Sequence, residues 1–136
     1  MLPGSRREAR ERAIGLLYEA DMRSCGVGDL LAELPVAPDA YAGDLVRGVD
    51  ERRSQLEAYI RRYLRADWPY ERLPAIDRIV LLLATFELVE RSDVPTGVIL
   101  SEAVELAKRY STEESGRFVN GLLASVADEV RPTTQA

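Results

Sequence analysis

The sequence predicts an all-α fold, a compact single-domain bundle of about six to seven helices. Apolar residues recur at three- and four-residue spacing in most segments, which is the period of an amphipathic helix. No segment alternates apolar and polar residues in the way of a half-buried strand. Proline and glycine fall between the periodic segments, where helices usually end. We therefore expect one helical domain over residues 1–131 and a disordered tail over residues 132–136.

The first helix is expected to begin after Ser5 and to end near Arg23. Ser5 is followed three residues later by Glu8, which is the capping-box pattern. The apolar residues of one helical face then follow: Ala9, Ala13, Leu16, Leu17 and Ala20. Gly26 and Gly28 come after the last of them and indicate the end of the helix.

The middle of the chain predicts two further helices of unequal length. A short helix over 29–34 is ended by Pro35. A longer one covers 39–65, with a bend near Gly48, and stops before Pro69 because the residue before a proline disfavours helical geometry.

The segment 76–89 is apolar on most faces, so we expect it to be the buried central helix. Pro74 suits the first turn of that helix. Glu87 interrupts the apolar residues, and a buried carboxylate at that position would need partners. Two more helices are expected over 98–109 and 112–130.

The composition argues against an enzyme. Histidine is absent, which removes the commonest general base and the commonest metal ligand. Cys25 is the only cysteine, so neither a Cys–His nucleophile, an intrachain disulfide nor a structural zinc site is expected. We therefore expect no catalytic residue, no metal and no cofactor. No apolar run approaches the roughly 18 residues of a membrane-spanning helix, and the N-terminus does not resemble a secretion signal, so a cytoplasmic location is expected.

The net charge of -5 argues against a surface coated in nucleic acid. Two local clusters of residues nevertheless suggest nucleic-acid binding. One is the arginine block Arg6, Arg7 and Arg10, in which Arg6 and Arg10 share a helical face. The other is Arg117 beside Phe118, just after a second capping-box pattern over 111–114. A cation and an aromatic face there could meet an unpaired base. The alternative is that the aromatic ring is core and the arginine is solvated.

Several longer motifs carry a family resemblance. In chain order they are RREAR at 6–10, IDRIVL at 76–81, FEL at 86–88, DVP at 93–95, EAVELAKRY at 102–110 and RFVNGLL at 117–123. Their order and spacing resemble the NusB family of transcription antitermination factors over nearly the whole chain. The resemblance implies a non-catalytic all-α factor that binds single-stranded boxA RNA of ribosomal operons. It also implies a partnership with NusE, a small-subunit ribosomal protein, in an RNA polymerase antitermination complex.

The resemblance implies RNA-binding roles for Arg6, Arg7, Arg10, Arg117 and Phe118. We predict that these five residues form one surface, because each alone is a weak site, whereas together they could hold phosphates and stack a base. The start of the first helix and the start of the last must then be neighbours.

The resemblance also implies roles for three other residues. Glu114 matches an acidic position at which family members are sensitive to substitution. Tyr18 and Asp77 match positions on the NusE-facing surface. An acid such as Asp77 near a helix start is also favoured by the helix dipole, with no partner needed. Glu8 stands where some relatives carry another arginine, which weakens the local positive field.

Two classes of function stay open at this stage. The first is the RNA-binding antitermination factor. The second is a helical dimerisation or adaptor module that binds protein partners only, with its arginines on a solvated face. A homodimer through the first helix would have to pair those arginines with acids such as Glu8, Glu11 or Glu19, because a two-fold interface presents the same patch twice.

Overall fold

The computed structural model describes residues 5–132, and that range contains seven α-helices, a short 3₁₀ turn and no strand. The helices are α1 (Arg6–Arg23), α2 (Val27–Glu33), α3 (Ala40–Glu51), α4 (Arg53–Tyr63), α5 (Ala75–Glu90), α6 (Thr96–Tyr110) and α7 (Glu113–Val130), and the 3₁₀ turn is Tyr70–Arg72. The all-α prediction is confirmed. The predicted tail falls almost wholly outside the described residues. No helix within 5–132 is long and apolar enough to cross a membrane.

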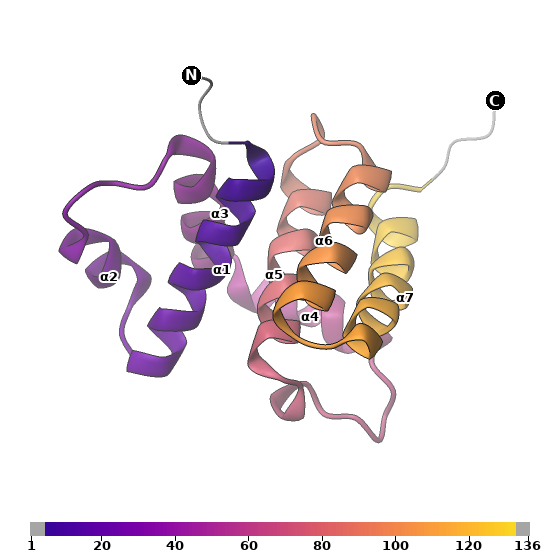
Figure 1. The fold of residues 1–136 in the computed structure, drawn as a ribbon. Helices are drawn as coiled ribbons and strands as arrows, with labels where there is room; N and C mark the ends of the chain where they lie inside the picture. Colours follow the sequence, from indigo (N-terminus) through magenta and orange to yellow (C-terminus); the bar gives the residue numbers. More distant parts are fainter. Residues whose placement is uncertain (1–4, 133–136) are drawn as a thin grey trace.

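Helix α5 is the centre of the bundle and contacts both halves of it. It packs against α1 and α3 on one side and against α4, α6 and α7 on the other (Figure 1). Every residue from Ile79 to Leu88 is buried. A helix that is apolar on nearly all faces is stable only inside other helices, so the prediction of a buried central helix is confirmed.

The segment predicted as one long helix over 39–65 forms two helices, α3 and α4. The chain leaves the helix at Arg52, not at Gly48 where a bend was predicted. Arg52 leaves helical geometry, with φ −112° and ψ 17°. Gly48 instead lets α3 lie close to α5, since a Cβ at that position would overlap the ring of Phe86.

The starts of α1 and α7 are fixed by side-chain caps. In α1 the Ser5 hydroxyl accepts a hydrogen bond from the Glu8 backbone N–H, and the Glu8 carboxylate completes the predicted capping box. Glu8, which stands within the arginine block, is therefore part of the cap of α1. In α7 the cap is Thr112, one residue later than predicted, and its hydroxyl accepts from the Ser115 backbone N–H at 3.0 Å.

The helix directions decide which ends are neighbours. Figure 1 shows α1 and α6 beginning at one end of the molecule and α7 beginning at the other. Helix α6 has 15 residues and so spans about 22 Å at 1.5 Å per residue. The residues before α6 and those after it therefore lie far apart.

Candidate nucleic-acid interface

Arg10 is buried, with its side chain only 5% exposed. Its Nε and Nη2 each donate to a different oxygen of Glu87, both at 2.8 Å. The Tyr41 hydroxyl donates to the same carboxylate at 2.6 Å. Burial and this hydrogen bond raise the pKa of Tyr41 to about 12. The buried Glu87 thus has the partners that it needs, and the prediction that Arg10 lies on an exposed surface is wrong.

Arg6 is exposed, but it is held by two groups. Its Nη2 donates to Asp93 at 3.1 Å, and its guanidinium lies 4.6 Å from the centre of the Tyr41 ring. Arg91 lies at the same distance from that ring and also pairs with Asp93. Hydrogen bonds from Arg91 and then Arg6 hold the pKa of Asp93 below its usual range.

Arg7 is exposed and forms a bidentate pair with Glu102. Its Nε and Nη2 donate to the two carboxylate oxygens at 2.9 Å and 2.6 Å. The pKa of Glu102 is lowered chiefly by this hydrogen bond. Only the arginine of this pair is exposed, because the Glu102 side chain is 14% exposed and also lies 3.8 Å from Arg10. A phosphate could therefore reach Arg7 only by displacing a partly covered carboxylate. We call Arg6 and Arg7, with their partners Asp93 and Glu102, the α1 arginine face.

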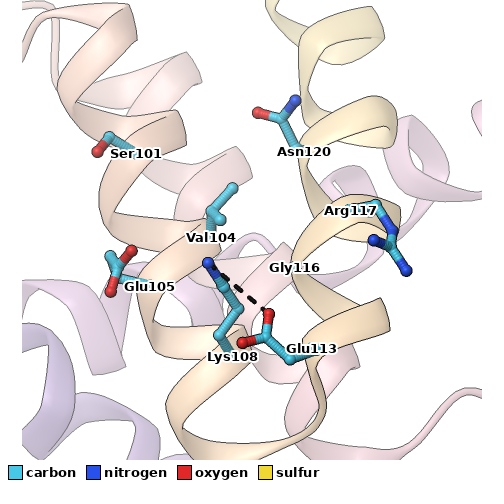
Figure 2. A pocket seen from close by; sticks show the side chains of 8 residues that line it. All are labelled: Ser101, Val104, Glu105, Lys108, Glu113, Gly116, Arg117 and Asn120. Carbon is cyan, nitrogen blue, oxygen red and sulfur yellow. Dashed lines mark ion pairs between the residues drawn. The ribbon is translucent and has the colours of Figure 1, made fainter.

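A groove between α6 and α7 carries other cations (Figure 2). Its volume is about 440 Å³. Lys108 faces Glu113 across it, with 3.8 Å between Nζ and Oε2. Gly116 permits this arrangement, because a Cβ there would lie 2.6 Å from Lys108 Cγ. Arg117 is exposed, points away from Lys108 in Figure 2 and forms no ion pair with any residue that the structure describes.

Phe118 is half-buried against the ring of Trp68. The two ring centroids are 5.0 Å apart and the planes are tilted by 38°. A cavity of about 200 Å³ lies beside the rings and is also lined by Asp77 and Ser115. Phe118 is therefore neither a fully buried core residue nor a free ring. We call Arg117, Phe118 and Trp68, with this cavity, the α7 start.

The five residues predicted to bind RNA do not form one surface. Arg6 lies beside Asp93, just before α6 begins, whereas Arg117 and Phe118 follow the residue at which α6 ends. Arg10 is packed at Glu87, ten residues along α5 from Asp77, which lines the cavity beside Phe118. The helix starts are at opposite ends because α7 runs back along α6 (Figure 1). The prediction that they are neighbours is wrong.

The three other residues to which the resemblance assigns a role, Tyr18, Asp77 and Glu114, lie in different surroundings. Tyr18 is 40% exposed on α1, and Met22, one turn further along the same helix, is also exposed. Asp77 is only 4% exposed, and its Oδ2 accepts a hydrogen bond from Ser115 Oγ at 2.9 Å. The Asp77 side chain is thus covered by the fold, which does not support its predicted place on the NusE-facing surface. Glu114 is exposed and lines the cavity at the α7 start.

Sequence reasoning missed Trp68, Tyr41 and Ser115. Trp68 is the only tryptophan and stands before a proline in a loop, which is a signal that could have been used. Tyr41 and Ser115 carry no such signal, because their partners Glu87 and Asp77 lie 46 and 38 residues away in the chain.

The chain is similar to known proteins over nearly the whole range that the structure describes. The NusB family model matches residues 7–128. The transcription antitermination protein NusB of Kineococcus radiotolerans is 42% identical, over 97% of this chain and 98% of that protein. The structure of T. maritima NusB is similar with a TM-score of 0.85, at 38% identity and 96% coverage of both chains. A structure of the antitermination factors NusB and NusE in complex with dsRNA contains a chain with a TM-score of 0.78, at 27% identity, covering 91% of this chain and 96% of that one. This chain belongs to the NusB family.

Proposed function

We propose that this protein is a non-catalytic transcription antitermination factor. It binds boxA RNA of ribosomal operons together with NusE, as part of an RNA polymerase antitermination complex. Membership of the NusB family supports this proposal, as does the likeness to a chain in a complex of NusB, NusE and dsRNA.

The observation that carries the RNA-binding proposal is the α7 start. Arg117 is exposed without an acidic partner among residues 5–132, and the adjacent Phe118 packs on the half-exposed Trp68. An unpaired cation beside aromatic rings is the combination that binds single-stranded RNA, since the cation neutralises a phosphate and a ring stacks on a base.

The α1 arginine face is the second RNA contact in this proposal. Arg6 and Arg7 reach phosphates by leaving Asp93 and Glu102, so their contribution is reduced by the pairs that must break. Arg10 acts differently, because its buried pair with Glu87 ties α1 to α5 and so positions the two exposed arginines.

The NusE surface in this proposal is the exposed side of α1 around Tyr18 and Met22. These two side chains are four residues apart, so they share one helical face and form an apolar patch. Asp77 has no direct part in it, because its side chain is buried.

A protein-only adaptor is the second candidate, and the pairing of Arg6, Arg7 and Arg10 with acids favours it. The acids that a homodimer would need to pair with these arginines, however, already have partners within the chain. Glu8 caps α1, Glu11 accepts hydrogen bonds from Arg109 and Tyr110, and Glu19 pairs with Arg23.

Binding of boxA RNA at two salt concentrations, with and without NusE, tests the proposal. We expect the protein to prefer boxA RNA over a scrambled RNA of the same composition and to bind it more weakly at the higher salt. The adaptor alternative predicts NusE binding with no preference between the two RNAs. Light scattering on the same samples reports whether the protein is a monomer or a homodimer.

A further inference from the structure

Arg131 follows the last residue of α7, and its side chain reaches the end of α5 (Figure 1). Five hydrogen bonds of 2.6–3.2 Å hold its guanidinium; the acceptors are the carbonyl oxygens of Glu87, Leu88, Arg91 and Val94 and the hydroxyl of Thr96. A guanidinium has five N–H donors, so these acceptors match its full capacity. The last carbonyl groups of a helix lack partners inside the helix, and Arg131 supplies donors to them at the end of α5.

The same hydrogen bonds fix the α5–α6 loop, residues 91–95. Nη2 of Arg131 lies 2.7 Å from the carbonyl oxygen of Arg91, and Nη1 lies 2.6 Å from that of Val94. These two carbonyl groups flank Asp93 in the chain. One side chain at the end of α7 therefore sets the position of the backbone that carries Asp93.

Asp93 is the residue through which this loop contacts α1. Its Oδ2 accepts a hydrogen bond from Arg6 at 3.1 Å, and both of its carboxylate oxygens accept from Arg91. The side chains of Arg6 and Asp93 are each about half exposed, so a phosphate can compete with the carboxylate for Arg6. The carboxylate competes best when the loop is already fixed, because pairing with a mobile loop costs backbone entropy.

We propose that Arg131 is a positioning residue for RNA binding, which holds Asp93 against Arg6 and so limits the positive charge that α1 offers to RNA. This inference rests on the proposed function, because it requires RNA at the α1 arginine face. Arg131 does not itself contact RNA in this account, since all five of its donors are used within the protein. A looser α5–α6 loop then releases Arg6 and strengthens RNA binding.

The main test is Arg131→Lys, which keeps the net charge. An ammonium has three donors on one atom and cannot replace the planar set of five. We expect this variant to bind boxA RNA about twofold to threefold more tightly than the wild type, which is the effect of losing one exposed ion pair. Arg65→Lys is the matched control, because Arg65 is exposed in the loop after α4 and its change should leave the affinity as it is.

A double-mutant cycle shows whether the gain acts through Asp93. Asp93→Asn should raise the affinity by about twofold to threefold in the wild type but by less than about 1.5-fold in Arg131→Lys, because Arg6 is already released there. Asp29→Asn removes the same charge from an exposed position on α2 and should act equally in both backgrounds. A purely structural role of Arg131 predicts the same gain from Asp93→Asn with and without Arg131.

Two further measurements cover the case in which Arg131→Lys does not fold. Ser92→Gly loosens the same loop without altering Arg131, because glycine has more backbone freedom, and it should raise RNA affinity in the same direction. In the wild-type protein, the Nε–H of Arg131 should exchange with solvent at least about tenfold more slowly than that of the exposed Arg65.

The outcomes separate the inference from the proposed function. If boxA RNA binds no better than scrambled RNA, the proposed function fails. If boxA RNA binds specifically, the inference is overturned when Arg131→Lys binds it no more tightly than the wild type, or when Asp93→Asn gives the same gain in both backgrounds. Where Arg131→Lys does not fold, it is overturned by unchanged affinity of Ser92→Gly or by an Arg131 Nε–H that exchanges as fast as that of Arg65.

Discussion

The α1 arginine face and the α7 start both carry arginine, but they differ in what the arginine already contacts. Arg6 and Arg7 each have an acidic partner, at 3.1 Å and 2.6 Å. Arg117 has none within residues 5–132 and lies beside the Phe118 and Trp68 rings. A cluster of arginines in a sequence is therefore a poor measure of available positive charge, because acids from distant segments can neutralise it. The single arginine at the α7 start is the more available cation.

The largest effect is expected from Arg10→Ala, and it is an effect on folding. Removing Arg10 takes away the ion-pair partner of the buried Glu87 and leaves only the Tyr41 hydroxyl donating to it, which should destabilise the protein by about 3–5 kcal/mol. Arg12→Ala is the control, since Arg12 is exposed on the same helix and its change should stay within about 0.5 kcal/mol. Urea unfolding measures the free energy of unfolding of both variants. Equal stability of the two variants, with RNA affinity reduced only in Arg10→Ala, would mean that Arg10 contacts RNA directly.

Phe118→Ala should weaken RNA binding by roughly 1–3 kcal/mol if the ring contributes to stacking. Phe118→Leu is the matched variant, because it keeps most of the apolar volume against Trp68 and removes the aromatic face. We expect Phe118→Leu to retain most of the stability and to lose most of the RNA affinity. Thermal unfolding and fluorescence anisotropy on the same samples decide this. A large fall in melting temperature with unchanged affinity per folded molecule would assign Phe118 to the core alone.

Arg117→Ala should change the salt dependence of RNA binding. For single-stranded RNA the slope of log K against log salt falls by about 0.7 for each phosphate that the protein no longer neutralises. Arg23→Ala removes an exposed arginine at the opposite end of α1 from Arg6 and Arg7, in neither region, and should leave the slope unchanged. Anisotropy titrations at four salt concentrations give both slopes. Equal slopes for the two variants would show that Arg117 does not bind a phosphate.

The smallest effect is expected from Glu102→Gln. This change weakens the hold on Arg7 and should raise RNA affinity by about twofold to threefold, because the arginine no longer has to leave a carboxylate. Asp29→Asn removes the same charge from an exposed position on α2 and should change affinity less. If both variants gain the same amount, the gain is a general charge effect and the pair with Arg7 does not limit binding.

The features that could be predicted from the sequence are those that depend on residues close together in the chain. The capping box at Ser5 and Glu8 located the start of α1, and the apolar run of α5 identified the buried helix. The break at Arg52 could not be predicted, because neither proline nor glycine marks it. The 3₁₀ turn Tyr70–Arg72 is too short to show a period.

The candidate site depends on contacts between distant segments, and these decided where the predictions failed. Glu87 was recognised as a carboxylate that would need partners if buried, which is half of the pair. The other half, Arg10, lies 77 residues away and looked like a surface residue because it belongs to an arginine block. The burial of Asp77 could not be predicted for the same reason, since the residue that covers its carboxylate, Ser115, is 38 residues away.

The α7 start, with its available cation and aromatic rings, is where we expect RNA to meet this protein first. The sharpest test is to follow backbone amide and indole resonances by NMR while boxA RNA is added. The single tryptophan gives one indole N–H signal, which belongs to Trp68. We predict the largest shifts at residues 111–120 and at that indole signal, with smaller shifts around Arg6 and Arg7. Shifts confined to α1, with the indole signal unchanged at saturation, would show instead that RNA binds at the α1 arginine face.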